Sequence, residues 1–270
     1  MRSIVYNGLD LSEFSSTEVI DKVAFPIAAN TMVVPGRAGA LLVSGRIPPR
    51  LVRVRLYMDA GYKPGTNGLA DIRHRVYSAL CSTDGGTLRL PDEPELEYRD
   101  AVCTDAGAWS SLFEDGHGDV DFTLLDPVAY GMGRCEVGTS FEVGGTWPTW
   151  PTFELVASAG SAVQVGCGGK VVRVERPFSG GEVVSIDCAS EGVTIGGVDA
   201  RADVTLSSDF FSLLPGICTL AFSGCSSYMT AFHERWLCWL ALFPNSGGST
   251  ASTSASASCP WLASWCTPKS

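Results

Sequence analysis

Residues 114–131 read EDGHGDVDFTLLDPVAYG and contain carboxylates and an imidazole at alternate positions, namely Asp115, His117, Asp119 and Asp121. Oxygen and imidazole ligands of this kind bind divalent cations, and such a cluster can support metal-dependent hydrolysis. A calcium loop of EF-hand type would need Gly at its sixth position and Glu at its twelfth, whereas a loop beginning at Asp115 has Val120 and Asp126 there. A metal-dependent hydrolase is therefore kept only as a minor alternative.

The same residues also have the period of a β-strand. Polar and apolar side chains alternate, with Asp119, Asp121 and Thr123 set against Val120, Phe122 and Leu124. A period of two puts the acids on an outer face and the apolar side chains on an inner one. Gly116 and Gly118 favour a turn before this strand, and Asp126–Pro127 stops it. We therefore expect a strand and its exit at the end of a domain.

Other catalytic motifs are missing from the sequence. It contains no G-x-S-x-G and no H-E-x-x-H, and its three histidines, His74, His117 and His233, have no partner motif. GCGGK at 166–170 superficially resembles a phosphate loop, but it lacks the required spacing and precedes a β-type run, which favours a hairpin turn. The sequence thus predicts no enzyme, no bound cofactor and no metal.

Two indoles in WPTWP, Trp147 and Trp150, leave one binding function open. Exposed aromatic rings on a β-sandwich can stack on sugars, so a carbohydrate-binding module for host cell-wall glycans is the alternative function. Pro148 and Pro151 fix the backbone and remove ladder donors, which favours entry into a strand and a packing role for the indoles.

Composition excludes several classes of protein. A net charge of −10 opposes binding to nucleic acid through its phosphates. Ten cysteines without a C-x-x-C are typical of a reduced protein that uses Cys as a small apolar side chain, although Cys259 and Cys266 could pair if oxidised. We see no signal-peptide core, and the longest apolar run, 236–243, is too short for a bilayer. We expect a soluble, cytoplasmically made protein without membrane insertion.

The two halves of the chain differ in pattern. RLVRVRLYMD at 50–59 predicts a strand with an apolar and a cationic face, and the stripe of Leu69, Ile72, Val76 and Leu80 predicts one helix at about 67–83 with His74 in solvent. The first half is therefore α+β. The second half is all-β, with short runs separated by Gly-rich turns: TFELVAS, AVQVGC, KVVRVER, EVVSID, GVTIGG, DVTLSS, ICTLAFSG and YMTAFHERWL. Ser, Thr, Ala and Gly dominate 246–258, where we expect disorder.

The order of several phrases resembles the siphovirus distal tail protein family. They are IVYNGLDLSEF, VVPGRAGALLVSGRIPPRLVRVRLYM, the helix, GTLRLPDEPELEYRDAV, VDFTLLDPVAYG, GGTWPTWPTFEL, FFSLLPGICTLAFSG and FHERWL. The resemblance implies a mainly β protein with one helix. Residues 1–128 would form a split-barrel-like α+β ring domain and residues 129–238 a galectin-like β-sandwich. Residues 239–270 depart from the resemblance, because such proteins usually end before them, and their composition predicts a disordered tail.

The resemblance also implies a function and structural roles for single residues. It implies a non-enzymatic virion protein, assembled in the bacterial cytoplasm into a hexameric ring that joins the tail tube to the tail tip or baseplate. Its partners would be further copies of itself, the tail tube protein, a tail-tip protein and a receptor-binding protein, with no sequence-specific nucleic acid. The residues that match the family's turns and domain junction are Gly36, Arg37, Gly39, Asp126, Pro127, Gly131, Leu214, Pro215 and Gly216.

Overall fold

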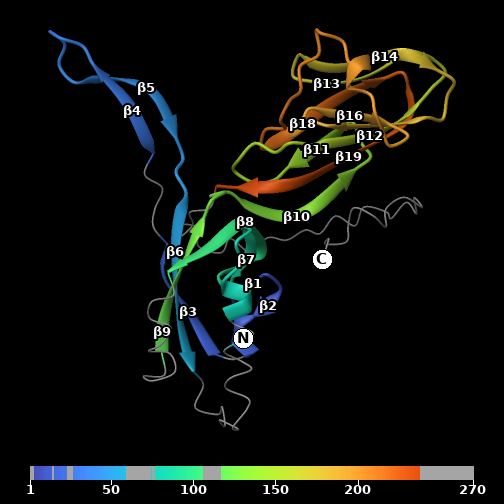
Figure 1. Cartoon of the computed structure of the whole chain (residues 1–270). Helices are drawn as coiled ribbons and strands as arrows, with labels where there is room; N and C mark the ends of the chain where they lie inside the picture. Colours follow the sequence, from blue (N-terminus) through green and yellow to red (C-terminus); the bar gives the residue numbers. More distant parts are fainter. Residues whose placement is uncertain are drawn as a thin grey trace. The chain divides into compact units, whose positions relative to one another are not determined.

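The chain forms two compact units, residues 1–130 and residues 131–270 (Figure 1). The computed structural model describes residues 3–13, 15–22, 27–58, 74, 77–105 and 117–237. The predicted tail at 239–270, with Cys259 and Cys266, lies outside the described residues, and so does Asp115. Among the described residues, no helix has the length and apolar character needed to cross a membrane.

The first unit is built around one antiparallel sheet. Its strands are β1 (Val5–Tyr6), β2 (Leu9–Asp10), β3 (Ser15–Lys22), β6 (Arg50–Met58), β7 (Gly86–Leu90), β8 (Glu93–Asp105), β9 (His117–Leu124) and the start of β10 (Ala129–Glu136), and a short 3-10 helix, η1, covers Leu11–Glu13. Strands β3, β6, β9 and β8 are successive neighbours, and β8 also pairs with β7, which leads to β1 and β2.

Apolar side chains at alternate positions of two strands form the core of this unit. Val52, Val54 and Leu56 of β6 and Val120, Phe122 and Leu124 of β9 are at most 2% exposed. The ring of Tyr6 packs 4.9 Å from that of Phe122, and its hydroxyl donates to the carbonyl of Ala101. The predicted strands and their apolar faces are confirmed. One boundary was wrong, because Gly118 does not lie in a turn but within β9, opposite Leu56 of β6.

Only part of the predicted helix can be compared. Residues 74 and 77–80 are helical, and the amide of Cys81 donates to the carbonyl of Tyr77 over 2.8 Å. His74 is exposed, as expected, and Leu80 is 3% exposed and belongs to the core. Of the predicted range 67–83, residues 67–73, 75 and 76 lie outside the described ones, and the described helix ends at residue 80 rather than 83.

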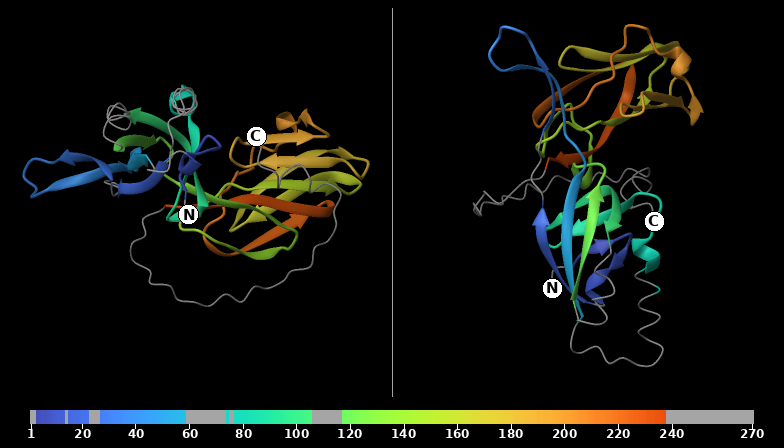
Figure 2. Two further views of the ribbon diagram at one scale, coloured as in Figure 1. Left: turned by 90° about the horizontal axis from the view of Figure 1, so that it is seen from below. Right: turned by 60° about the vertical axis from the view of Figure 1, so that its left-hand side comes forward.

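Two strands of the first unit form a sheet of their own. Strand β4 (Ala28–Val33) pairs with β5 (Ala40–Arg46), and neither pairs with a third strand in the part of the chain that the structure describes. Figures 1 and 2 show this pair as a long hairpin that extends from the strands of its unit. We call residues 27–46 the arm.

The second unit is a β-sandwich of two antiparallel sheets (Figure 2). The first sheet has the order β17-β16-β15-β12-β19-β10, and the second β11-β18-β13-β14. The strands are β11 (Ser140–Val143), β12 (Thr152–Ala157), β13 (Gly160–Cys167), β14 (Lys170–Phe178), β15 (Val183–Asp187), β16 (Gly192–Ile195), β17 (Val198–Asp199), β18 (Gly216–Ser223) and β19 (Cys225–Trp236), with a short 3-10 helix, η2, at Arg201–Asp203.

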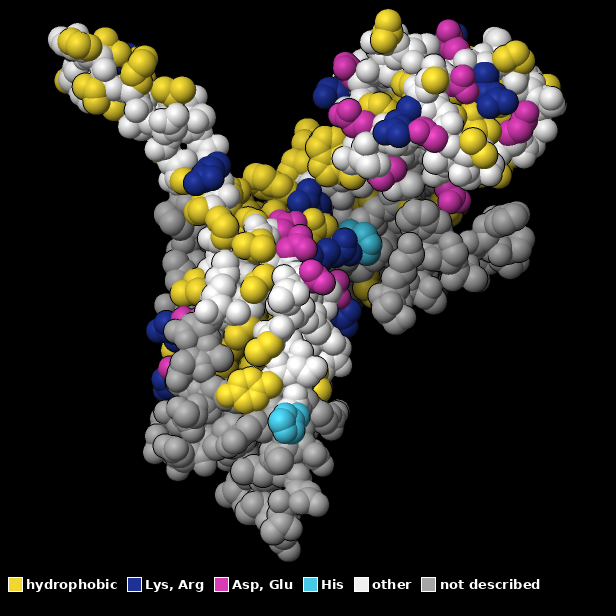
Figure 3. Space-filling model, in the orientation of Figure 1, with side chains coloured by type: hydrophobic (Ala, Val, Ile, Leu, Met, Phe, Trp, Pro, Cys, Tyr) yellow, Lys and Arg dark blue, Asp and Glu magenta, His cyan; other side chains and the backbone are white. Residues whose placement is uncertain are grey.

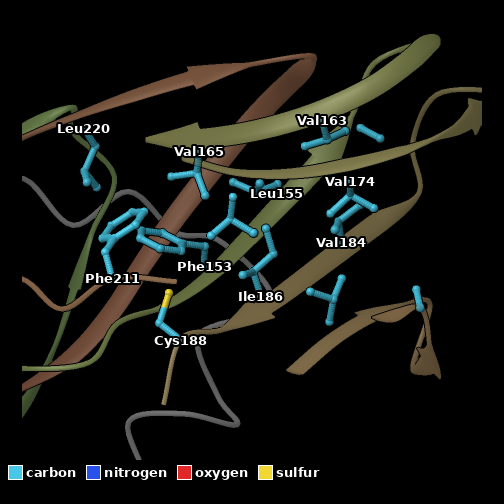
Figure 4. Packing of buried hydrophobic residues seen from close by; sticks show 14 of the residues in the cluster. Phe153, Leu155, Val163, Val165, Val174, Val184, Ile186, Cys188, Phe211 and Leu220 are labelled. Carbon is cyan, nitrogen blue, oxygen red and sulfur yellow. The ribbon is translucent and has the colours of Figure 1, made fainter. Parts of the chain in front are cut away.

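The inner faces of the two sheets enclose an apolar core (Figure 4). Phe153 of β12 lies at its centre, with its ring 5.7 Å from that of Phe211 and 6.1 Å from that of Phe222. Valines and leucines of both sheets surround these rings, among them Leu155, Val163, Val165, Val174, Val184 and Leu220. Aromatic rings in tilted contact at such distances add to the stabilisation from burial alone.

The β-type runs of the second half became strands with one exception. The prediction of a strand at DVTLSS was wrong. Its first residue ends η2, Val204 forms an isolated bridge with Val174, and a turn follows. This segment runs beside β14, where Thr205 and Asp209 donate to backbone carbonyls of that strand. The turn in GCGGK is confirmed, since positive φ angles at Gly168 and Gly169 make the tight connection between β13 and β14.

Thiol burial leads to a prediction for cysteine chemistry. Burial raises the pKa of Cys188 from 9.0 to about 11, whereas Cys81 is exposed. Because the thiolate is the reactive form, a shift of two units reduces its population roughly 100-fold. We expect iodoacetamide at pH 8 to alkylate the exposed Cys81 within minutes. The alkylation rate of Cys188 should be lower by roughly 100-fold or more. Mass spectrometry of labelled peptides measures both rates, and equal rates would contradict the prediction.

Candidate functional site

A ladder of paired charges connects two strands of the first unit. Arg53 and Arg55 of β6 lie opposite Asp121 and Asp119 of β9 in the register of the sheet. The Nε and Nη2 atoms of Arg53 both donate to Asp121 over 2.7 Å, and those of Arg55 donate to Asp119 over 2.6 and 2.9 Å. Each pair is therefore bidentate, the geometry that gives an arginine–carboxylate pair its greatest strength.

Burial differs between the two pairs. The side chain of Asp121 is 12% exposed and that of Asp119 30% exposed. Asp121 therefore lies on the polar face, as the alternation suggested, but its side chain is largely shielded from solvent. Hydrogen bonding to Asp119 also raises the pKa of the Arg55 guanidinium above its ordinary value. The alternating acids thus pair with arginines across two neighbouring strands.

This arrangement bears on the predicted metal cluster. Both oxygens of Asp119 and of Asp121 accept hydrogen bonds from guanidinium groups, so a cation would have to displace an arginine from each of them. His117 begins β9, but its side chain is outside the description. Among the described residues, no three His, Cys, Asp or Glu side chains are grouped to hold a metal ion.

The predicted junction residues lie where the first unit ends. The carboxylate of Asp126 accepts from the amide of Val128 over 3.1 Å and from the hydroxyl of Tyr130 over 2.6 Å, bracketing Pro127. The guanidinium of Arg99 lies 4.1 Å from the centre of the Tyr130 ring. Asp126 therefore caps the exit from β9 and holds the first residues of β10 in place.

The second unit begins at Gly131 with its own polar contacts. Nδ1 of His233 donates to the Gly131 carbonyl over 3.0 Å. Arg134 donates to Glu234 over 2.7 Å and to Glu136 over 2.8 Å, and hydrogen bonding to Glu234 raises the pKa of Arg134. These contacts tie the start of this unit, on β10, to its last described strand, β19.

The other predicted turn residues lie in or next to connections between strands. Gly36 and Gly39 have φ angles of +82° and +81° at the tip of the arm, where the amide of Arg37 donates to the carbonyl of Val34. Leu214 and Pro215 precede Gly216, the first residue of β18, whose φ is +110°. A role for these residues beyond the shape of the turns stays a prediction.

The two tryptophans of the sugar-binding alternative differ in exposure. Trp147 is half-buried and its amide donates to the carbonyl of Arg235, whereas Trp150 is 44% exposed. Between them the Thr149 hydroxyl donates to the carbonyl of His233 over 2.6 Å. Residues three apart in such an extended, bridged stretch point to opposite sides. The arrangement thus does not present the two indoles as one flat platform.

Sequence reasoning missed the apolar surface of the arm. Five of its large apolar side chains are 53–73% exposed: Ile27, Met32, Val33, Leu42 and Val43. Figure 3 shows apolar side chains gathered over β4 and β5. The available signal was an apolar run on each side of a Pro-Gly turn with Arg37 and Arg46 as its only charges. A pattern of this kind usually indicates burial within the chain, and for that reason the exposed surface escaped notice.

Comparisons with known proteins agree with this fold. Residues 144–236 match the family model described as siphovirus-type tail component, C-terminal domain. The distal tail protein of Bacillus phage SPP1 is 24% identical over 233 residues, which cover 80% of this chain and 89% of that protein.

One solved structure shares the fold. The crystal structure of the SPP1 Dit protein, described as a paradigm of the hub adsorption apparatus in phages that infect Gram-positive bacteria, matches with a TM-score of 0.67 and 19% identity. The match covers 86% of this chain and 98% of that one. A chain of the phage P2 baseplate, in its activated conformation with calcium, has a TM-score of 0.47 and 8% identity over 84% of this chain and 92% of that one.

The chain has two β-rich units, and the second matches a tail-component domain. These findings place it in the class of structural components of phage tails. Within that class, the chain resembles the siphovirus distal tail proteins, as its sequence indicated, and its residues 144–236 match the C-terminal domain of siphovirus-type tail components. Neither SPP1 relative is described as an enzyme.

Proposed function

We propose that this protein forms a hexameric ring, coaxial with the tail tube, that joins the tube to the tail tip or baseplate. The observation that carries the proposal is the match to the SPP1 hub protein over 98% of that protein's chain, which includes both units rather than the sandwich alone. The first unit would be the split-barrel-like ring domain and the second a galectin-like sandwich outside the ring.

Charge and surface also fit a ring. A ring subunit needs two complementary flanks, because each copy contacts its neighbours with different faces. The arm offers an apolar surface for such a contact. A net charge of −10 on each chain suits a passage for DNA, since a negative wall repels phosphates.

The partners follow from this position. Besides other copies of the chain, they are the tail tube protein above the ring, a tail-tip protein below it and a receptor-binding protein docked on the outer sandwich. The protein would be assembled in the bacterial cytoplasm and remain in the virion tail. Its role is structural, with no reaction, cofactor or sequence-specific nucleic acid.

Oligomeric mass tests the ring directly. Six copies of a 28.6 kDa chain give a particle of about 172 kDa. We expect mass photometry of the purified full-length protein to show this species, with its fraction rising with concentration, and negative-stain images to show six-fold rings. A protein that remained a 28.6 kDa monomer at high concentration and gave no rings, even with the tail-tip partner added, would overturn the proposal.

A further inference from the structure

Two cysteine side chains of the second unit are in contact across neighbouring strands. In the register of β13 and β18, Cys167 pairs with Leu220, and Cys218 lies two residues before Leu220 on the same strand. Because side chains alternate along a strand, these three share one face of the sheet. It is the inner face, since Leu220, which points into the core in Figure 4, is 3% exposed and Cys218 is 6% exposed. The two Sγ atoms are 3.6 Å apart.

A covalent bond between these sulfurs needs only a small movement. A disulfide has an S–S length of about 2.05 Å, so the sulfurs must approach each other by about 1.6 Å. Diagonal neighbours on two strands lie near the upper limit of the span of a disulfide, so one strand must shift slightly. Cys167 ends β13, and an added Cβ at either residue of the Gly168–Gly169 turn that follows would meet nothing within 4 Å. The end of this hairpin therefore has room for that shift.

The two thiols differ in their access to solvent. Cys167 is partly exposed at the end of its strand, whereas Cys218 is buried. Burial, together with the contact to Cys167, raises the pKa of the Cys218 thiol above its ordinary value. Because the thiolate is the attacking species, an external disulfide reacts first with the accessible Cys167. Cys218 is then already beside the sulfur that it must attack.

We propose that Cys167 and Cys218 form a redox-controlled disulfide within the sandwich. The thiolate of Cys167 attacks a low-molecular-weight disulfide, which forms a mixed disulfide and releases one thiolate. The thiolate of Cys218 then attacks the sulfur of Cys167 and releases the second thiolate. Two protein thiols are thereby oxidised, one external disulfide is reduced to two thiols, and the two protons that the protein loses pass through solvent to the released thiolates.

The compartment decides when this bond closes. Cellular thiols keep cysteines reduced in the cytoplasm, whereas extracellular surroundings permit disulfides. The timing rests on the proposed virion location: subunits assemble with both thiols reduced, and the bond closes after the particle leaves the cell. It joins residues 51 positions apart and connects the β13–β14 hairpin to β18. A crosslink of this length stabilises the sandwich by restricting its unfolded state.

Peptide mapping of the full-length wild-type protein tests the bond. The purified protein is incubated with oxidised glutathione, its remaining thiols are blocked with N-ethylmaleimide, and peptides are analysed by mass spectrometry without reduction. We expect a peptide pair joined through Cys167 and Cys218 of one chain, whereas protein blocked inside the expressing cells should have both as thiols. Cysteines that stay free or bind only glutathione would overturn the bond. A bond already closed inside cells would overturn its redox control.

Thermal unfolding measures the consequence of the bond. We expect oxidation to raise the Tm of the sandwich by about 10 °C and dithiothreitol to reverse the rise. Cys167→Ser should abolish the rise. Cys225→Ser is the matched control and should retain it, because it removes another partly buried thiol of the same unit. An equal rise in both variants would contradict the assignment to Cys167 and Cys218, and no rise in the wild type would overturn the stabilising role.

Mass photometry of the same samples separates this inference from the proposed ring. Six-fold rings without a bond between Cys167 and Cys218 would overturn the disulfide alone. The bond in a protein that forms no rings would support the disulfide and overturn the ring. Neither bond nor rings would overturn both.

Discussion

Replacing Asp121 by Ala is expected to destabilise the first unit by about 2 kcal/mol. The substitution removes both hydrogen bonds of a carboxylate that is 12% exposed and leaves Arg53 without that partner. Breaking a fully buried pair costs about 3–5 kcal/mol and an exposed pair less than about 1. The expected value lies between these limits because the Arg53 side chain is 46% exposed.

Hydrogen exchange on the full-length protein measures this effect where it occurs. Amides of β6 and β9 should exchange faster in Asp121→Ala, while those of the second unit keep their protection. Asp119→Ala is the matched control and should have a smaller effect, because that side chain is 30% exposed. The double variant with Arg53→Met should recover part of the loss. Equal effects of the two Asp variants, with no coupling to Arg53, would show that burial does not decide the stability of the ladder.

The ladder shows what local sequence could and could not predict. Alternation in RLVRVRLYMD and DVDFTLL is a local property, and it predicted both strands and their buried faces. Which aspartate pairs with which arginine depends on the register between β6 and β9. The paired residues are more than 60 positions apart in the sequence. Nothing local sets that register, so the acids first resembled a metal cluster. The same pairing explains why Asp121 is buried although it lies on the polar face.

The arm and DVTLSS were misjudged for a related reason. Apolar runs such as those of β4 and β5 are normally buried within their own chain, and the local pattern cannot indicate that they are exposed here. Conversely, DVTLSS has a strand-like composition, but its backbone donates to a carbonyl of β14 at Thr205, and the next such bond comes from Asp209, just after the segment. In both cases the outcome depends on whether distant parts of the chain contact the segment, which the local pattern does not contain.

Close backbone packing in the sandwich leads to the second large effect. Gly224, between β18 and β19, has a φ of +74°, and a Cβ there would lie 2.1 Å from the carbonyl oxygen of Ala162 on β13. Its own carbonyl accepts from the amide of Ser158. Moving away would break pairing in the sheet, because the obstacle is backbone rather than a flexible side chain. We therefore expect Gly224→Ala to destabilise the second unit by about 4 kcal/mol or more.

Gly168→Ala is the matched control for this variant. Gly168 also has a positive φ, +57°, but an added Cβ there meets nothing within 4 Å, so only backbone strain of about 1 kcal/mol is expected. Calorimetry of the full-length proteins, with limited proteolysis to assign the transition to the sandwich, compares the two variants. The difference between them isolates the steric clash, since both carry the conformational cost. If both variants lost the same stability, the close approach of Gly224 to β13 would not constrain the sandwich.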